Sequence, residues 1–555
     1  MKRSRGKKGR IQGRTTPVEA LAAVRGLLGD APRTRDMLIE HLHKIQDHFH
    51  HISNNHILAL ATEMHLSMVD IYETASFYHH FDIVKPGEKP PPSVTVRICE
   101  SLSCAMYGAH DLIEELNSST DKHSVRIQAV PCVGRCASAP VAVVGTKPIE
   151  NATKENIISA IDNKEYSDSI PSDYIDYDTY KENGGYKTLL DCVDGKQSRE
   201  DIISLLENSN LRGLGGAGFP TGRKWRILSQ QEGPRLVAIN IDEGEPGTFK
   251  DRVYLETDPH RFIEGTLIAH WAIQAEDIYI YLRDEYAGCR EMLEKELAAL
   301  RAKPPCKLPN IHLRRGAGAY ICGEESAMIE SIEGKRGIPR LRPPYVAEVG
   351  LFGRPTLEQN MESMHWIRDI IENDPEWFSS HGRRDRKGLR SFSVSGRVKK
   401  PGVHLAPAGI SMRELIDEYC DGMLEGQEFY GYFPGGASGG ILPAALGDEP
   451  LDFDTLQQHG CFIGSAAIVV LSDKDSAKTM ALNAMKFFED ESCGQCTPCR
   501  VGTSKAVKLM KKAEWDKPLL EELSSVMVDA SICGLGQAAP NPLRCAMKYF
   551  SHEFE

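Results

Sequence analysis

The sequence predicts a multidomain α/β protein, and three observations support this. Its 555 residues suffice for about three to five domains of ordinary size. Hydrophobic residues make up 41% of the chain, as in globular domains with real cores. Strand-like and helix-like segments alternate between about residues 205 and 380, which is typical of α/β domains. The longest apolar run, about Phe462 to Leu471, is too short to span a bilayer.

The N-terminus is strongly basic although the whole chain has a net charge of −12. We expect residues 1–30 to form a disordered arm, with docking on an acidic partner as the alternative. No apolar stretch follows the arm, so we expect no secretory signal and a cytoplasmic protein with free thiols. The acidic balance argues against nucleic-acid binding. The basic residues of the arm are Lys2, Arg3, Arg5, Lys7, Lys8, Arg10 and Arg14.

The next two predicted domains are a helical bundle and a compact α/β unit. Apolar residues recur at helical spacing from Leu38 to Phe49, which predicts a bundle over residues 31–90. Three strands, Val94–Ile98, Val125–Val130 and Val141–Gly145, then alternate with a helix at Asp111–Leu116. This pattern predicts a domain over residues 91–165.

Four further segments complete the domain prediction. Residues 166–204 are acidic and rich in tyrosine, so we expect a linker or wrapping segment. Residues 205–385 form the largest α/β domain. Residues 386–471 predict a small β-rich domain, in which Ser411 and Glu414 form a capping box at the start of a helix. Residues 472–555 predict a helical tail.

Cysteines in the tail have the spacing of a metal-cluster site. Cys493, Cys496 and Cys499 are separated by two residues each, and Cys533 follows after a helix-length gap. Four thiolates in this pattern suit a 4Fe–4S cubane. Structural zinc, which also accepts four thiolates, is the alternative.

A second cysteine group lies in the predicted unit of residues 91–165. Cys99 and Cys104 follow one strand, and Cys132 and Cys136 follow another, so the ligands belong to loops at one end of a sheet. Four thiolates from two such loops suit a 2Fe–2S cluster, with zinc again the alternative. We expect most of the other cysteines to be buried small hydrophobic residues: Cys192, Cys289, Cys306, Cys322, Cys420, Cys461 and Cys545.

A glycine-rich loop supplies bare backbone for a ligand. Gly213, Gly215 and Gly218 satisfy G-x-G-x-x-G, but the Rossmann interpretation is disfavoured because the preceding Leu205–Asn210 is polar and loop-like. Glycine lets backbone N–H groups approach a phosphate or a flat ring, and Lys224 adds a positive charge. A flexible surface loop is the alternative.

Two more segments place carboxylates beside glycines directly after strands. The strand Leu236–Ile239 leads into Asn240, Asp242, Glu243 and Glu245, and the strand Ile311–Leu313 leads into Gly316–Ser326. Ligands of α/β sheets bind at the carboxyl ends of strands, where carboxylates accept hydrogen bonds from ribose hydroxyls and ring groups. The three loops together predict a nucleotide pocket.

These residues together resemble the flavoprotein subunit of respiratory complex I. The most specific stretches are GAGAYICGEESAMIES, from Gly316 to Ser331, and ESCGQCTPCRVG, from Glu491 to Gly502. Residues from about 30 to 160 resemble the complex I subunit with a 2Fe–2S cluster on a thioredoxin-like fold, through Phe77–Phe81 and the two cysteine pairs. Residues from about 390 to 470 resemble the β-grasp, ubiquitin-like SLBB domain. The resemblance implies one FMN, NAD(H), one 4Fe–4S and one 2Fe–2S cluster.

Fusions of these subunits occur in soluble NAD-linked formate dehydrogenases and NAD-reducing hydrogenases. The segments Asp529–Pro542 and Pro401–Gly409 are most similar to the β subunit of the formate enzymes. The resemblance implies a large molybdenum or tungsten α subunit as partner, and electron transfer from formate through clusters and FMN to NAD⁺. The same module in a hydrogenase or complex I, and a zinc-stabilised nucleotide-binding scaffold, remain as alternatives.

The family also implies roles for individual residues. Phe219 and Tyr345 match the aromatic positions at the adenine end, and no side chain acts as an acid–base catalyst. Glu245, Tyr320 and Glu325 match residues that contact the dinucleotide, with Glu245 and Glu325 positioning it. The chain departs from complex I relatives at Leu214 and at Glu358–Gln359, so Gln359 is left out of the flavin contacts. The implied FMN cradle is Gly213, Gly215, Gly216, Ala217, Lys224, Asn240, Asp242, Glu243, Gly323, Glu324 and Asn360.

Overall fold

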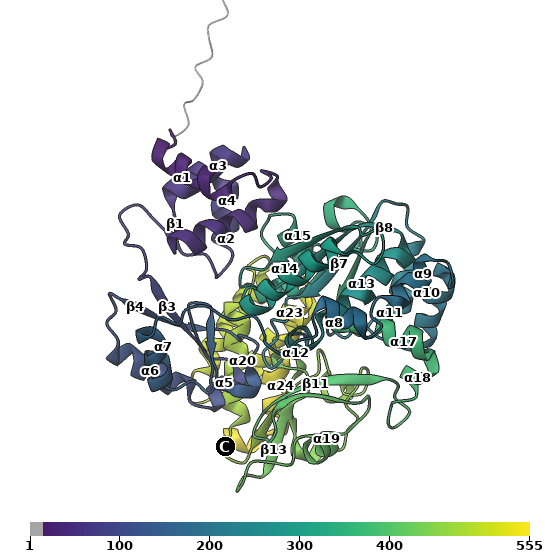
Figure 1. Ribbon diagram of the computed structural model, residues 1–555. Helices are drawn as coiled ribbons and strands as arrows, with labels where there is room; N and C mark the ends of the chain where they lie inside the picture. The colour runs from purple at the N-terminus through teal and green to yellow at the C-terminus, as the bar shows by residue number, and fades with distance from the viewer. Residues whose placement is uncertain (1–14) are drawn as a thin grey trace, which may run out of the picture. The chain divides into compact units, whose positions relative to one another are not determined.

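The computed structural model describes residues 15–555 and divides the chain into two compact units (Figure 1). The first unit extends to Pro91 and includes Glu333–Arg336. The second contains the rest of the chain. None of the helices in the described part combines the length and the apolar character needed to cross a bilayer.

The first unit is the predicted helical bundle. It contains α1 (Val18–Leu28), α2 (Leu38–Phe49), α3 (Asn54–Met64), α4 (Met68–Ala75) and a two-stranded parallel pair, β1 (Ile52–Ser53) with β2 (Ile83–Val84). The bundle forms because α2 buries its apolar face, and Ser53 caps α3 by accepting the backbone N–H of His56.

The prediction of a disordered arm over residues 1–30 is wrong for residues 18–28. These residues form α1, which buries Val24 and Leu28 in the bundle. The basic residues at the N-terminus had drawn attention away from this short apolar periodicity. Residues 1–14, with all seven basic side chains, lie outside the described residues.

The second unit begins with a four-stranded sheet of order β4-β3-β5-β6. β3 (Val94–Cys99) pairs in parallel with β4 (Val125–Val130), whereas β5 (Ala142–Val144) and β6 (Lys147–Ile149) are antiparallel. The connecting helices are α5 (Leu102–Met106), α6 (Ala109–Ser119) and α7 (Lys154–Asp162). The three strands and the helix predicted between residues 94 and 145 are therefore present.

Residues 166–204 form packed helices and not an irregular linker. They contain α8 (Tyr177–Glu182), α9 (Lys187–Val193) and most of α10 (Arg199–Asn208). Their tyrosines, predicted as part of a solvent-exposed composition, are bonded to buried groups of the next domain. The Tyr180 hydroxyl donates to Glu264 at 2.6 Å, and the Tyr186 hydroxyl lies 2.7 Å from Nδ1 of His260. The segment therefore wraps the nucleotide domain, as the second half of the expectation stated.

The largest domain is built on a parallel sheet of order β10-β7-β8-β9. The strands are β7 (Arg235–Ile241), β8 (Ala275–Leu282), β9 (Asn310–Arg315) and β10 (Thr356–Asn360). Figure 1 shows β7 and β8 flanked by the long helices α13 (Pro259–Ile273) and α14 (Ala287–Ala302). The shorter helices are α11 (Thr221–Ser229), α12 (Lys250–Thr257), α15 (Glu325–Ile332), α16 (Met361–His365), α17 (Ile367–Asn373) and α18 (Pro375–Ser379).

The β-rich domain is a five-stranded sheet of order β12-β11-β15-β13-β14. β11 (Leu389–Gly396) is parallel to β15 (Ala467–Ser472), and all other pairs are antiparallel. The predicted capping box is present at α19 (Met412–Tyr419). The remaining strands are β12 (Gly402–Pro407), β13 (Phe429–Phe433) and β14 (Leu442–Pro443).

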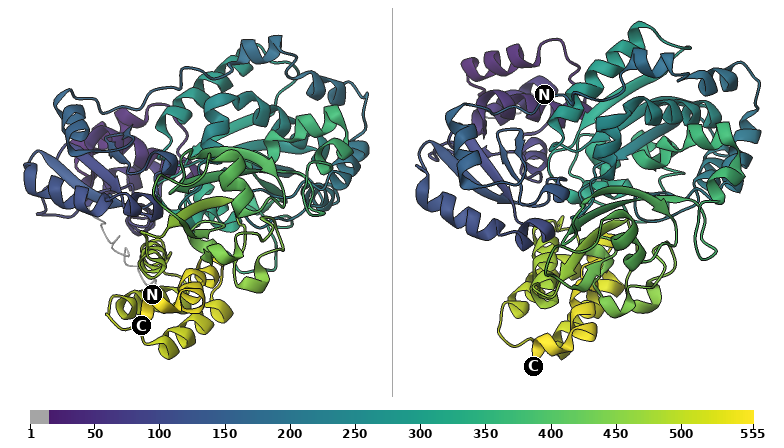
Figure 2. Two further views of the ribbon diagram at one scale, coloured as in Figure 1. Left: turned by 90° about the horizontal axis from the view of Figure 1, so that it is seen from below. Right: turned by 60° about the horizontal axis from the view of Figure 1, so that its bottom comes forward.

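The C-terminal helices gather beside this sheet, where Figure 2 shows them in yellow next to the green strands. They are α20 (Ala477–Asp490), α21 (Thr497–Met510), α22 (Lys517–Ala530), α23 (Gly534–Ala538) and α24 (Asn541–Tyr549). A buried contact joins them to the sheet: the Sγ atoms of Cys461 and Cys545 lie 3.4 Å apart. Six of the seven cysteines outside the two ligand groups are buried, which confirms their expected place in the core.

Candidate functional site

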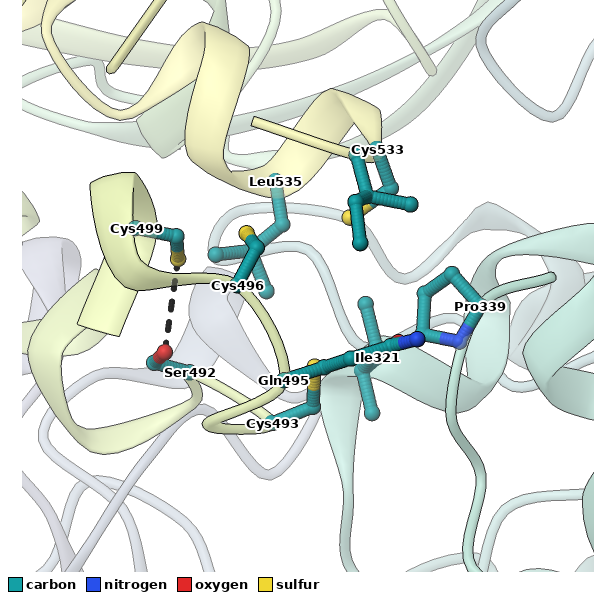
Figure 3. Close-up of a pocket in the computed structure, with 10 residues that line it drawn as sticks. Ile321, Pro339, Ser492, Cys493, Gln495, Cys496, Cys499, Cys533 and Leu535 are labelled. Atoms are coloured by element: carbon teal, nitrogen blue, oxygen red, sulfur yellow. Dashed lines mark hydrogen bonds between the residues drawn. The ribbon is translucent and has the colours of Figure 1, made fainter. Parts of the chain in front are cut away.

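The four cysteines of the tail surround one pocket (Figure 3). Cys493 and Cys496 lie in the turn before α21, Cys499 is in the first turn of that helix, and Cys533 directly precedes α23. The pocket leaves about 260 Å³ of space free of protein atoms, and apolar side chains, including Ile321 and Leu535, line its wall. The spacing prediction is thus confirmed in its geometric part, since Cys533 joins the three closely spaced thiols.

The pocket suits a metal cluster better than four free thiols. Burial raises the pKa of Cys499 to about 11 and that of Cys533 to about 12, so these thiols remain protonated near neutral pH without a metal. A metal supplies the positive charge that makes thiolates stable in such surroundings. The donor set, four sulfur atoms with apolar walls, fits a cubane cluster.

The second cysteine group is buried at the end of the first sheet of this unit. Cys99 is the last residue of β3, Cys104 lies in α5, and Cys132 and Cys136 lie on the loop after β4. The Sγ atoms of Cys132 and Cys136 are 3.2 Å apart, and the backbone N–H of Gly134 donates to Sγ of Cys132 at 3.4 Å. The four thiols are close enough to hold a compact 2Fe–2S unit.

A buried arginine fastens this cysteine loop to the nucleotide domain. Arg283 is 5% exposed and donates to the backbone carbonyl of Cys132 at 2.7 Å and to that of Glu243 at 2.6 Å. Arg252 donates to the carbonyl of Gly134 at 3.0 Å. Sequence reasoning missed both arginines because they belong to no motif and act through contacts distant in sequence.

Replacing Arg283 with glutamine should make the potential of the nearby cluster more negative. The guanidinium charge favours the reduced cluster, which carries more negative charge, so its loss lowers the potential by on the order of 50 mV. An EPR-monitored redox titration measures the shift. Arg290→Gln, which removes a partly exposed arginine paired with Asp284, is the control. Equal potentials in both variants would contradict the prediction.

The glycine loop lies between two helices, α10 and α11. Residues Leu205–Asn210 were predicted to be loop-like, but they continue α10 to Asn208, so that part of the argument is wrong. The conclusion drawn from it holds, because a helix and no strand precedes the glycines. A Cβ atom added at Gly215 would lie 2.9 Å from Cβ of Asn360, and the φ of Gly216 is +137°. Both positions therefore require glycine.

The loops after β7, β9 and β10 converge on the same edge of the sheet. Asn240 and Asn360 are direct partners in the register of β7 and β10. Asn240 donates to the carbonyl of Gly323 at 2.9 Å, and Lys224 donates to the carbonyl of Glu358 at 2.7 Å. Five of the residues that the resemblance assigns to the cradle therefore lie together, although their sequence positions span more than a hundred residues: Gly215, Lys224, Asn240, Gly323 and Asn360.

Two of the expected cradle carboxylates are used inside the protein. Glu243 accepts the backbone N–H groups of Asp251 at 2.6 Å and Arg252 at 3.1 Å, and so caps α12. Glu324 accepts those of Ser326 at 3.0 Å and Ala327 at 2.9 Å, at the start of α15. What these two residues offer the pocket is their backbone.

The remaining carboxylates of the predicted site are more available to a ligand. Asp242 is 5% exposed, and burial raises its pKa well above the usual range of an aspartate. Glu245 accepts the Tyr320 hydroxyl and the backbone N–H of Ser438, the latter at 2.8 Å, and burial raises its pKa as well. Glu325 lies 3.6 Å from Lys224.

Two exposed aromatic side chains border the glycine and carboxylate loops. Phe219 is 41% exposed and Tyr345 is 55% exposed, so each offers a ring face to a flat ligand. Ala217, in the same loop as Phe219, is also exposed. These are the positions expected to hold the adenine end of a dinucleotide.

Tyr320 joins the nucleotide loops to the C-terminal cysteine pocket. Its hydroxyl donates to Glu245, and its backbone N–H donates to Glu491 at 2.9 Å. Glu491 lies two residues before the first cysteine of the run, and Ile321, next to Tyr320, lines the cysteine pocket. Sequence reasoning included Tyr320 but missed Glu491 and Ser438; only Glu491 had a signal, its place in the cysteine motif.

Comparisons with known proteins agree with this geometry. Family models match residues 24–165 (thioredoxin-like [2Fe-2S] ferredoxin), 206–369 (Nuo51 FMN-binding domain) and 479–555 (NADH-ubiquinone oxidoreductase-F iron-sulfur binding region). An NADH-quinone oxidoreductase flavoprotein-type (F 2) chain of Rhizobium meliloti is 40% identical over 68% of this chain and 93% of its own length. The mitochondrial NADH dehydrogenase [ubiquinone] flavoprotein 1 of Dictyostelium discoideum is 37% identical over 75% and 91%. The chain belongs to the NADH-quinone oxidoreductase-F family.

A solved structure extends the likeness over nearly the whole chain. A chain of the NAD⁺-reducing [NiFe]-hydrogenase in the H₂-reduced state is 29% identical, with a TM-score of 0.83, and the match covers 94% of both chains. The protein is therefore an NADH-oxidising flavoprotein electron-transfer subunit with an FMN-binding domain, a thioredoxin-like 2Fe–2S domain and a 4Fe–4S region. The iron–sulfur interpretation of both cysteine groups is confirmed, and the zinc alternative is discarded.

Replacing Gly215 with valine should remove FMN from the purified protein. The added side chain would displace Asn360 or the glycine loop, since even a Cβ atom meets Asn360 at 2.9 Å. We expect at least about a tenfold loss of bound flavin, measured by absorption after denaturation, with iron content unchanged. Gly233→Ala is the control, because a Cβ atom there meets nothing within 4 Å. Normal flavin content in Gly215→Val would count against the cradle.

Proposed function

We propose that this chain is the diaphorase subunit of an NAD-dependent formate dehydrogenase. Formate would be oxidised on a large molybdenum or tungsten partner subunit, and electrons would pass through the iron–sulfur sites and FMN to NAD⁺ as a reversible hydride transfer. The resemblance of Asp529–Pro542 and Pro401–Gly409 to the β subunit of formate enzymes supports this partner. The link from Glu245 through Tyr320 to Glu491, which joins the nucleotide loops to the cubane pocket, is the observation that carries the electron-transfer role.

The residues of the site have distinct tasks in this function. Bound flavin exchanges two electrons with nicotinamide and single electrons with clusters, which explains why all three belong in one chain. Gly215 and Gly216 leave room for a flat ring at the edge of the sheet. Lys224 holds a positive charge there, between Glu358 and Glu325. Glu245, held by Tyr320 and Ser438, orients the dinucleotide by hydrogen bonding.

A second candidate is the same role in an NAD-reducing hydrogenase. The structural likeness to a hydrogenase chain, which covers 94% of both chains, favours it. In that case hydrogen, and not formate, would supply the electrons. The nucleotide site and both cluster sites would work in the same way.

Purification of the native complex under mild conditions tests the partner. We expect a large molybdenum- or tungsten-containing subunit to co-purify, and the complex to reduce NAD⁺ with formate but not with hydrogen. Hydrogen-dependent NAD⁺ reduction would favour the second candidate and overturn the first. The isolated, cofactor-loaded chain should oxidise NADH with ferricyanide and fail to oxidise formate, because its sequence contains no motif for formate chemistry.

A further inference from the structure

The N-terminal helical bundle concentrates histidine in a way that the electron-transfer function does not use. Nine of the 19 histidines of the chain lie within residues 41–80. Neither the flavin loops nor the two cysteine groups contain any of them. They are His41, His43, His48, His50, His51, His56, His65, His79 and His80.

Two of these histidines and an aspartate point their ligand atoms at one place. His43 and Asp47 lie one turn apart on α2, so their side chains share a face of the helix. His80 comes from the segment after α4. One ligand atom from each of the three side chains lies within 4.8 Å of those of the other two, and Nε2 of His80 is 3.9 Å from Oδ1 of Asp47.

The two elements that carry these side chains are fixed against each other. Gln46, next to Asp47, accepts the backbone N–H of Asp82 at 3.0 Å and donates to the Asp82 carboxylate at 3.3 Å. The hydroxyl of Tyr78 donates to the carbonyl of Lys335 at 2.7 Å and so anchors the segment that leads to His80. The three ligands are thus held close together by contacts that do not involve them.

We propose that His43, Asp47 and His80 form a binding site for a divalent transition-metal ion, with zinc as the best match. Two imidazoles and one carboxylate suit zinc and its neighbours and do not suit magnesium or calcium, which prefer oxygen ligands. Zinc bonds of about 2.0–2.1 Å place tetrahedral ligand atoms about 3.3 Å apart, so the site closes by about 1.5 Å at most. Rotation of Asp47, whose side chain is 50% exposed, can supply this movement.

The surroundings favour bound metal at this place. His43 is 2% exposed and its ring meets the edge of Phe81, with centroids 4.9 Å apart, so one side of the site is apolar. The side chain of His80 is 13% exposed, and Asp47 opens to solvent, which leaves room for water as a fourth ligand. The ion would join α2 to the segment after α4 and stabilise the bundle by binding only its folded form.

Zinc binding to the full-length protein, with both iron–sulfur clusters filled, tests the proposal. We expect one zinc ion per chain, measured by metal analysis after dialysis against micromolar zinc. The zinc K-edge EXAFS spectrum should show only nitrogen and oxygen neighbours at about 2.0 Å. A sulfur shell at about 2.3 Å would place the zinc in a cysteine cage and overturn the proposal.

Matched variants assign the ligands. His80→Ala and Asp47→Asn should each weaken zinc binding at least tenfold. His79→Ala and His48→Ala, which remove exposed histidines adjacent to the ligands, should leave it unchanged. Asp47 is half exposed, so Asp47→Asn keeps the test open if His80→Ala fails to fold. Absence of zinc binding, or equal affinity in all four variants, would overturn the proposal.

Discussion

Replacing Cys533 with serine should abolish the normal 4Fe–4S cluster while NADH oxidation by ferricyanide continues. Cys533 is the only one of the four pocket cysteines that lies outside the 493–499 run, so its loss opens the cage on the side of α23. Electron transfer from NADH to the partner subunit of the native complex should fall by at least about 100-fold, more than is usual for residues beyond the ligands. EPR of the reduced protein and the two activities measure these effects.

The control for this variant is Cys545→Ser. Cys545 is also buried in the C-terminal helices, but its sulfur lies 3.4 Å from Cys461 and does not line the cysteine pocket. It should keep the cluster signal and transfer to the partner. An intact cubane signal in Cys533→Ser would contradict the assignment of the fourth ligand.

Replacing Lys250 with methionine should destabilise the nucleotide domain strongly. Lys250 is 1% exposed, and its Nζ atom lies 2.8 Å from Asp251 and 2.9 Å from Glu362, which is also 1% exposed. Without the ammonium group two buried carboxylates would lack their cation, at a cost of about 3–5 kcal/mol. Asp251 also accepts from Asn360 at 2.7 Å, so the flavin cradle should loosen as well.

Thermal unfolding of the variant and its flavin content measure this effect. We expect a melting temperature lower by several degrees, because a loss of this size is large compared with domain stability. The double variant Lys250→Met with Glu362→Gln should recover part of the loss, since it removes one of the stranded charges. An unchanged melting temperature would show that the buried cluster contributes little.

Local patterns predicted much of the fold. β4 matches its expected bounds, and the helix after Ser411 begins at the expected capping box, because alternation and capping are properties of neighbouring residues. The edge strand β10 was missed because Thr356–Asn360 is short and mostly polar. The helices of residues 177–208 were missed because their stability depends on buried partners such as Glu264, which lie in another part of the chain.

The candidate site divides in the same way. Spacing identified both cysteine groups, because each loop carries its ligands within a few residues. The residues that join these groups to the nucleotide loops had no such signal. Arg283 and Lys250 act on residues that folding brings beside them, and nothing in their immediate sequence distinguishes them from surface charges.

The double attachment of Tyr320 makes nucleotide occupancy and cluster reduction thermodynamically reciprocal. One end of this residue reports to Glu245 and the other to Glu491. If bound dinucleotide shifts Tyr320, the electron affinity of the cubane changes by some free energy, and reducing the cubane must change dinucleotide affinity by the same amount. The cell's ratio of oxidised to reduced nicotinamide would then set how readily the cluster accepts an electron, as well as which way current flows.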